Sequence, residues 1–299
     1  MKGIIKLILS ALICVAFLVS TLVYITQSRD IPPFGKDYAV IRLFDTDGFS
    51  SSEISSIRFT ADNVSESTPD TKRLWCDAYS RFETARLTND SEKSVDSVAV
   101  VTGGDWFLFH TLEFLDGWYY SDTDQNFDRV VIDERLAFQL FGSSNCEGMR
   151  VYVSGVPCYV AGVVALDESD AYKAQLEEKP LVYIPENIAE KIFGMKDFEY
   201  YEICMQNPVD SHALNSLKDV TEGKRAVDVT SRYSLKNTFL NLKSFTTRSI
   251  VTGEETLPFW ENDDRQREDT LVILEVLVAI SFVSFVIHLI LFIIERKKR

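Results

Sequence analysis

RVVIDERLAFQLFGSSNCEGMRVYVSGVPCYVAGVVA, residues 129–165, is the stretch that decides the fold. Its opening run Val130–Ile132 is β-branched and predicts a short strand. Asp133 is a favoured N-cap residue for the helical pattern that follows, and Gly142 stands where a left-handed residue commonly ends a helix. The first half of the stretch therefore predicts a strand that leads directly into a short capped helix.

The second half predicts a β-hairpin, because two apolar runs, Met149–Val153 and Cys158–Ala165, flank the tight-turn signal Ser154-Gly155. Outward from this hairpin, short strands and short helices alternate. The patterns predict strands at Tyr38–Phe44, Val98–Thr102, Leu181–Ile184 and Tyr200–Met205, helices at Ser50–Phe59, between Pro185 and Gly194, and at Ser211–Val220, and loops at 61–72 and 88–96. This alternation is typical of an α+β domain.

Two apolar runs flank this domain. Leu7–Ile25 has no charged residue, and Leu271–Ile294 is interrupted only by Glu275 and His288. About 18 such residues suffice to cross a bilayer as a helix. The first run could instead be a cleaved signal peptide, but no A-x-A-like cleavage site follows it. We therefore predict transmembrane helices at 7–25 and 271–294.

Basic residues near the two runs predict their orientation. Lys2 and Lys6 precede the first run and Arg296 to Arg299 follow the second, and such residues favour the cytoplasmic side. We expect a two-pass protein of the cell (plasma or inner) membrane, with segments 1–6 and 295–299 in the cytoplasm. The 242 residues of 28–269 then form an extracytoplasmic domain large enough for two lobes, with residues 98–165 as an inserted lobe.

Several side chains in or near the spans are candidates for contacts. Ionisable groups inside a membrane are functional candidates, so Glu275 and His288 could meet a partner helix; alternatively, Glu275 reaches the interface and His288 stays neutral. Tyr24 and Phe259-Trp260 are expected at the outer headgroup level. Small residues that permit close helix approach are Ser10, Ala11, Cys14, Ala279, Ser281 and Ser284.

Charge excludes one class of partner. The net charge is −14, and because Lys2 and Lys6 contribute +2 and the tail 295–299 contributes +3, the segment between them carries −19. Nucleic-acid binding needs a basic surface, so no nucleic-acid partner is expected.

Four cysteines lie outside the spans, namely Cys76, Cys146, Cys158 and Cys204. In an oxidising compartment they permit two disulfides in three connectivities, but they could equally be buried thiols. Both alternatives stay open at this point, and the four are candidate disulfide cysteines.

Residues 100–164, from Val100 to Val164, resemble the periplasmic core domain of MacB-like (FtsX-related) ABC transporter permeases. Trp118 departs from the family, which usually has Arg there. The family also continues with a stalk, a coupling helix and two more spans, whereas this sequence stops five residues after its second apolar run. The matching residues are Val101, Thr102, Trp106, Phe107, Gly117, Val130, Val131, Ile132, Ala137, Leu140, Phe141, Gly142, Gly148, Val151, Val153, Gly155, Val160, Gly162, Val163 and Val164.

The resemblance implies a permease component of an ABC-type transport system, whose outer domain binds or relays conformational change. It also implies a separate ABC ATPase, and further permease chains or a homo-oligomer in the lipid bilayer. The alternative is a two-span sensor or adaptor that binds a partner without transport.

Catalytic signatures are missing from the sequence. It contains no G-x-x-x-x-G-K-[ST], G-x-S-x-G or H-E-x-x-H, so we expect no enzyme and no cofactor. The acidic loop from Asp122 to Asp133 has calcium-loop spacing but carries Phe127 in place of the required glycine, so no metal is expected. His110, in an aromatic run, is expected to be a packed core residue, and His212 an exposed residue in the first turn of a helix.

Overall fold

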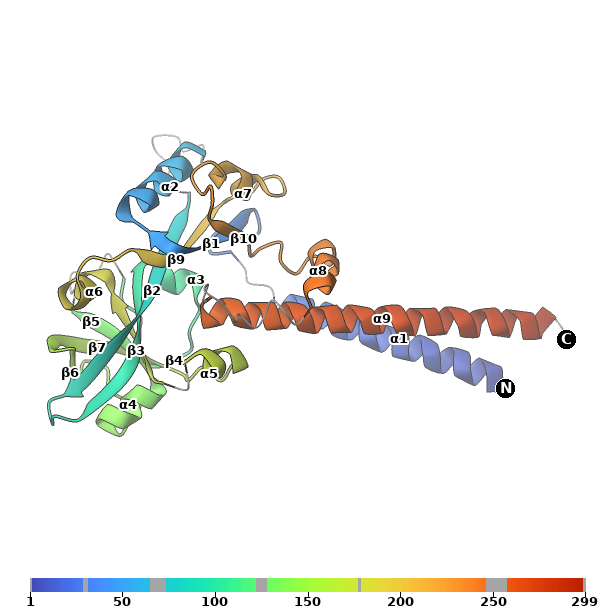
Figure 1. Cartoon of the computed structure of the whole chain (residues 1–299). Coiled ribbons are helices and arrows are strands. Elements are labelled where there is room, and N and C mark those ends of the chain that lie inside the picture. The colour runs from blue at the N-terminus through green and yellow to red at the C-terminus, as the bar shows by residue number, and fades with distance from the viewer. Residues whose placement is uncertain are drawn as a thin grey trace. The chain divides into compact units, whose positions relative to one another are not determined.

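The structure is a computed structural model that describes residues 2–28, 32–64, 74–121, 128–176, 179–245 and 257–297. The chain divides into two compact units (Figure 1). The larger unit is Ile31–Thr230, a mixed α/β domain, and the smaller unit combines Met1–Asp30 with Ser231–Arg299 and is helical. Residues 231–245 and 257–269, which were expected to belong to the outer domain, thus group with the helices at the two ends of the chain.

Ten strands and six helices are described in the larger unit. The strands are β1 (Tyr38–Phe49), β2 (Cys76–Asn89), β3 (Ser94–Gly104), β4 (Phe114–Gly117), β5 (Arg129–Asp133), β6 (Arg150–Val153), β7 (Val156–Val164), β8 (Leu181–Pro185), β9 (Phe198–Gln206) and β10 (Arg225–Asp228). The helices are α2 (Ser51–Val64), α3 (Trp106–Phe109), α4 (Glu134–Phe141), α5 (Asp170–Leu176), α6 (Glu186–Phe193) and α7 (His212–Leu217).

All ten strands form one sheet, in the order β10-β1-β9-β2-β3-β8-β5-β7-β4. Strand β6 pairs with both β2 and β7, so β2, β3, β8, β5, β7 and β6 close into a ring. The pairs β3–β8 and β5–β7 are parallel, and the other pairs are antiparallel. The strands within 98–165 belong to this same sheet, and the assignment of an inserted lobe stays a prediction.

Local sequence signals explain how the helices begin. At the start of α2, the Ser50 amide donates to Glu53 Oε2 at 2.9 Å and the Glu53 amide donates to Ser50 Oγ at 3.3 Å, which is a reciprocal capping box. Asp133 accepts a hydrogen bond from the Leu136 amide at 2.7 Å and caps α4. Gly142 ends α4 in the left-handed region with φ 77°. Both caps and the hairpin β6–β7 agree with the sequence prediction.

Two loop predictions are wrong at their ends. The predicted loop 88–96 is mostly strand, because β2 continues to Asn89 and β3 begins at Ser94. Polar residues within these strands obscured the pattern; Asn89, for example, is buried and its Nδ2 donates to the Leu140 carbonyl at 2.7 Å. The loop predicted at 61–72 begins too early because α2 extends to Val64, and residues 65–72 lie outside the described ranges.

A close backbone approach explains two glycines of the family motif. Gly117 of β4 pairs with Gly162 of β7, and Gly117 has φ 63°. A Cβ atom at Gly117 would lie 2.2 Å from the Ala161 carbonyl oxygen, and one at Gly162 would lie 2.6 Å from the Trp118 carbonyl oxygen. Neither distance is sterically possible, so only glycine lets β4 join the sheet here.

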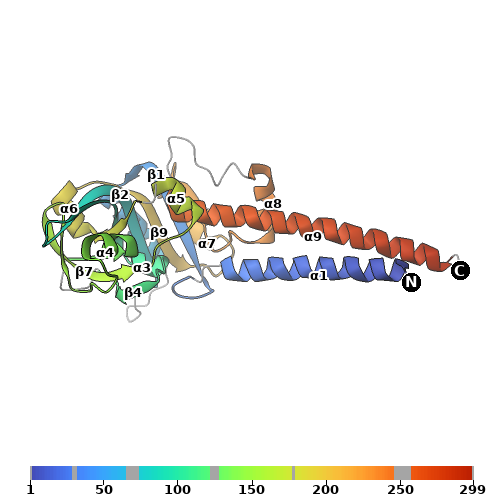
Figure 2. The same cartoon turned by 90° about the horizontal axis from the view of Figure 1, so that it is seen from below.

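The smaller unit consists of α1 (Lys2–Ser28), α8 (Leu235–Asn241), a 3-10 turn (Leu242–Ser244) and α9 (Phe259–Lys297), as Figure 2 shows from a second side. Helices α1 and α9 are each long and apolar enough to cross a membrane. They pack antiparallel: a Cβ atom at Gly3 would lie 2.9 Å from Glu295 Oε2, so the start of α1 meets the end of α9.

The two long helices meet along a heptad seam. Buried and half-buried residues recur at alternating spacings of three and four, which is the repeat of left-handed helix pairs. Of the small residues expected to allow close approach, Ser10, Cys14 and Ser281 lie on this seam, whereas Ala279 is exposed. The seam consists of Gly3, Leu7, Ser10, Cys14, Phe17, Thr21, Tyr24 and Ser28 on α1, and of Leu271, Leu274, Val278, Ser281, Phe285, His288 and Phe292 on α9.

We predict that Gly117→Ala destabilises the protein far more than Gly148→Ala. Both glycines have positive φ, 63° and 75°, so both variants incur a left-handed strain of about 1–2 kcal/mol. Only at Gly117 does the new methyl group also meet backbone, because nothing lies within 4 Å at Gly148. Urea unfolding of the full-length variants in detergent, followed by tryptophan fluorescence, measures the difference. Equal unfolding free energies would contradict the close-approach argument.

Candidate functional site at the start of the C-terminal helix

Helix α9 begins well before the apolar run that was predicted to span the membrane. It starts at Phe259, twelve residues ahead of Leu271. At 1.5 Å per residue, this polar extension is about 18 Å long. The predicted span 271–294 is therefore the second part of a 39-residue helix. Phe259-Trp260 stands at the far end of the extension, and the expectation that this pair lies at the headgroup level stays a prediction.

One face of the extension carries buried charges. Glu261, Asp264, Arg265 and Glu268 recur at spacings of three and four residues, so they share a face, and each is at most 6% exposed. Charged groups are rarely buried unless they are paired. This face therefore requires an oppositely charged partner from another part of the chain.

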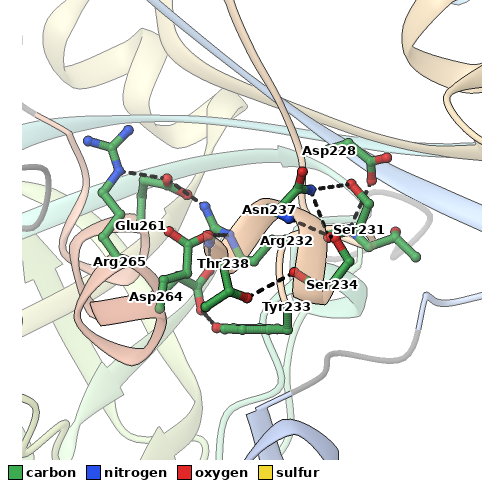
Figure 3. A network of polar contacts seen from close by, with 12 residues as sticks. Asp228, Ser231, Arg232, Tyr233, Ser234, Asn237, Thr238, Glu261, Asp264 and Arg265 are labelled. Atoms are coloured by element: carbon green, nitrogen blue, oxygen red, sulfur yellow. Dashed lines mark hydrogen bonds and ion pairs between the residues drawn. The ribbon is translucent and has the colours of Figure 1, made fainter. Parts of the chain in front are cut away.

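Arg232 is that partner (Figure 3). Its guanidinium side chain is 2% exposed and reaches three carboxylates, at 2.7 Å to Glu261, 2.5 Å to Asp264 and 3.0 Å to Glu268. Each contact uses a different guanidinium nitrogen, which suits the planar fork of arginine and would not suit lysine. Arg265 adds a second cation, with its Nε 3.0 Å from Glu261 Oε1.

Neighbouring hydrogen bonds hold Arg232 in place. The Tyr233 hydroxyl donates to Asp264 at 3.3 Å, and burial followed by the Asp264 charge raises the pKa of this tyrosine. Ser234 Oγ accepts from the Asn237 amide at 3.4 Å and caps α8. Asn237 Nδ2 donates back to the Ser231 carbonyl at 2.9 Å. The turn 231–234 is thus fixed to both α8 and α9.

We call Arg232, Tyr233, Glu261, Asp264, Arg265 and Glu268 the α9 charge cluster. Removing one partner from a buried ion pair typically costs 3–5 kcal/mol, because the remaining charge stays buried. The cluster therefore fixes where the chain leaving the larger unit joins α9. Because the three carboxylates span two helical turns, the cluster opposes both sliding and rotation of α9 against this turn.

The intramembrane candidates Glu275 and His288 are separate from this cluster. Glu275 lies one turn after Leu271, and its Oε1 is buried without a hydrogen-bond partner among the described residues. His288 lies on the seam between α1 and α9, and its Nδ1 is 2.9 Å from the Ser284 carbonyl of its own helix. Their role as contacts to a partner helix stays a prediction.

The four candidate disulfide cysteines are buried free thiols in this structure. Cys76 of β2 and Cys204 of β9 are register partners, so they are the pair placed for a cross-strand bond. Cys146 and Cys158 belong to the main core, and burial raises their pKa to about 11 and about 12. Disulfide formation stays a prediction.

A second buried polar group lies in the larger unit. Glu202 of β9 is 2.6 Å from Arg42 Nε and 2.5 Å from His110 Nε2. His110 also stacks on Trp106, with ring centroids 4.2 Å apart. Burial alone would raise the pKa of Glu202, but the charges of His110 and Arg42 lower it from 4.5 to about 2. His110 is a packed residue, as expected from its aromatic surroundings, and it is also an ion-pair partner.

The acidic loop and His212 are the remaining candidates from the sequence. Among the described residues, no group of three or more His, Cys, Asp or Glu side chains could hold a metal ion. Residues 122–127 of the acidic loop lie outside the described ranges. His212 begins α7 and is half-buried.

The profile of the MacB-like periplasmic core domain matches residues 7–220, most of the chain. The chain belongs to the MacB-like periplasmic core domain family. The match ends before Arg232, so the α9 charge cluster lies outside the part of the chain that defines MacB-like membership.

Two solved structures are similar to this MacB-like chain. The extracellular domain of the noncanonic ABC-type transporter YknZ from Gram-positive bacteria is 18% identical, with a TM-score of 0.47, and the match covers 63% of this chain and all of that one. The periplasmic region of MacB from Actinobacillus actinomycetemcomitans is 17% identical, with a TM-score of 0.46, and the match covers 72% and 94% of the two chains. No curated protein matches the sequence.

Neither Arg232 nor Glu202 was predicted from the sequence as a functional residue. The spacing of Glu261, Asp264 and Glu268 was a usable signal, because three acidic residues on one helix face call for a cation. Nothing in the sequence placed Arg232 opposite them, since the pairing depends on the turn before α8. Glu202 had no local signal, because its partners come from β1 and the segment after α3.

We predict that Glu202→Gln weakens the acid sensitivity of the protein. A carboxyl whose pKa is lower in the folded state stabilises the protein above pH 4.5, and this stabilisation disappears as the pH falls through about 2. A fall in pKa from 4.5 to about 2 corresponds to about 3 kcal/mol. Over that pH range, urea unfolding of the wild type should therefore lose about 3 kcal/mol more than unfolding of the variant.

Glu199→Gln in the same strand is the matched control for this experiment. Burial raises the pKa of the Glu199 carboxyl, so this side chain favours the folded state as the pH falls. Its replacement should change the acid dependence in the opposite direction. The same direction in both variants would contradict the assigned role of Glu202.

We predict that Arg232→Met opens the start of α9. The variant keeps an unbranched side chain but removes the cation that contacts all three carboxylates, so the local cost is about 3–5 kcal/mol. Amide hydrogen exchange over 259–268 in the reconstituted full-length protein should be roughly 100-fold faster or more. Arg267→Met is the control, because its pair with Asp263 is partly exposed and contributes about 0.5 kcal/mol or less. Similar exchange in the two variants would contradict the cluster's role.

Proposed function

We propose that this protein is a non-catalytic permease component of an ABC-type transport system. The observation that carries the proposal is the continuity of α9, which runs without a break from the predicted span to the α9 charge cluster. An α-helix is stiff over this length, so a displacement of the span would move the cluster with it. Residue 231 follows the last residue of the larger unit directly, so this displacement would reach the extracytoplasmic domain through the backbone.

The cluster would act in this relay as a joint. Ion pairs spread over two turns of α9 resist slippage, so a push or rotation of the helix would act on the turn 231–234 without being lost in a loose linker. The larger unit would then bind a ligand or pass the movement on. No bond is made or broken in this mechanism, and any nucleotide hydrolysis would belong to another subunit.

The proposed topology places both termini in the cytoplasm and the larger unit outside the cell membrane. Support comes from the basic residues Lys2, Lys6 and Arg296 to Arg299 at the two ends of the chain.

A cysteine introduced at the exposed Ser91, in the β2–β3 turn, should react with an impermeant thiol reagent on intact cells.

The proposed partners are a separate ABC ATPase and further permease chains, or a homo-oligomer, within the lipid bilayer. Helices α1 and α9 meet along a single seam, and many of their other apolar residues are exposed, including Leu12, Ile280 and Phe282. Such surfaces suit lipid or additional helices. The overall charge of −14 gives no support for a nucleic-acid partner.

Crosslinking in native membranes followed by purification of the tagged full-length chain tests this proposal. We expect an ABC ATPase among the crosslinked proteins. We also expect Arg232→Met to keep that ATPase bound while uncoupling its activity from transport, with Arg267→Met behaving as wild type. A stable complex without an ATPase, and normal transport after deletion of the gene, would overturn the proposal and favour a sensor or adaptor.

A further inference from the structure

We propose that α8 and the 3-10 turn after it form a membrane-surface anchor, which binds the headgroup region of the outer leaflet beside α9. The anchor consists of the apolar residues Phe239, Leu240 and Leu242 and the flanking Lys236 and Lys243. This inference rests on the membrane topology of the proposed function but does not depend on an ATPase.

The two sides of α8 differ in burial. Phe239, Leu240 and Leu242 are 70%, 52% and 46% exposed. On the other side, Thr238 is buried and its hydroxyl donates to the Ser234 carbonyl at 2.9 Å. Tyr233, just before α8, is buried against Asp264 of α9. The helix is therefore covered at Thr238, it contacts α9, and it leaves Phe239 and Leu240, together with Leu242 of the following turn, exposed.

The position of α8 along α9 places these side chains near the membrane boundary. Figures 1 and 2 both place α8 beside α9, and the two helices are in contact. Arg232, three residues before α8, binds Glu268, which precedes Leu271 by three residues or about 5 Å along the helix axis. The headgroup layer on each side of the hydrocarbon core is roughly 5–8 Å thick. The Arg232–Glu268 contact, which holds the start of the anchor to α9, therefore lies at headgroup depth.

Local charge complements an anionic membrane surface. Residues 235–245, LKNTFLNLKSF, contain two lysines and no acidic residue, although the whole chain carries −14. Lys236 and Lys243 are exposed at either end of the apolar group. Basic side chains beside exposed aromatic and aliphatic residues are typical of short segments that lie in the membrane interface.

The anchor would also supply the aromatic group at the outer interface that was expected from Phe259-Trp260. On the proposed topology those rings would stand about 18 Å beyond Leu271, outside the headgroup layer. Phe239 is placed to serve as the aromatic group of the outer interface in their stead. Lipid is favoured over a neighbouring chain because the apolar group is small and is flanked by lysines.

Fluorescence quenching by brominated lipids tests the anchor in the reconstituted full-length protein. Phe239→Trp and Phe59→Trp are a matched pair, because Phe59 of α2 is 69% exposed in the larger unit. Each variant is compared with the parent protein in vesicles of phosphatidylcholine and phosphatidylglycerol. We expect lipids brominated near the headgroup to quench the fluorescence added at position 239 and to leave that added at position 59 unchanged.

Two outcomes would overturn the proposal. If aqueous iodide quenches position 239 as strongly as position 59 and brominated lipid does not, the segment faces water. If neither quencher reaches position 239, another protein chain covers it. A second measurement uses Lys236→Gln with Lys243→Gln, which should weaken lipid quenching of Phe239→Trp when phosphatidylglycerol is present. No change in quenching there would also contradict the anchor. Lipid quenching without a crosslinked ATPase would keep the anchor and reject the transport role.

Discussion

The whole outer end of the helical unit depends on the cost of burying one cation. Arg232 keeps its charge under all physiological conditions, so a site that is 2% exposed must bring counter-charges to it. Those counter-charges come from three positions of α9, and they are brought together only while α9 stays helical ahead of its apolar part. The helix therefore continues outward because its carboxylates and this arginine need each other.

The two parts of α9 are held in place by different interactions. In the polar extension, charge fixes the position of the helix against the turn before α8. In the apolar part, packing against α1 along the heptad seam does so, with Gly3 close to Glu295 and with Ser10 and Ser281 buried. A helix that is held by ion pairs in one part and by packing in the other behaves as one rigid element. A relay between membrane and outer domain would require this property.

Local chemistry made part of this structure predictable. The Asp133 cap, the left-handed Gly142, the Ser50 capping box and the β6–β7 hairpin each depend on neighbours within a few residues, and all were predicted. The apolar runs predicted both long helices. Long-range pairings were not predictable: Arg232 lies 29 residues or more from its carboxylates, and Glu202 lies 160 residues from Arg42. The apolar run 271–294 predicted a span but not the polar first part of α9, because hydropathy carries no information on a polar helix that continues beyond an apolar one.

The ring of strands has a consequence for how the outer domain meets other proteins. Strand β6 is paired on both sides, so closure leaves the sheet's free borders, within the described residues, at β10 and β4. Each of these strands is only four residues long. Unpaired edge strands are templates on which strands of other chains can pair, and short edge strands offer few backbone hydrogen bonds for such pairing. Short edge strands at both borders therefore lower the tendency of neighbouring copies of this domain to pair edge to edge, where long open edges would favour fibrous aggregation.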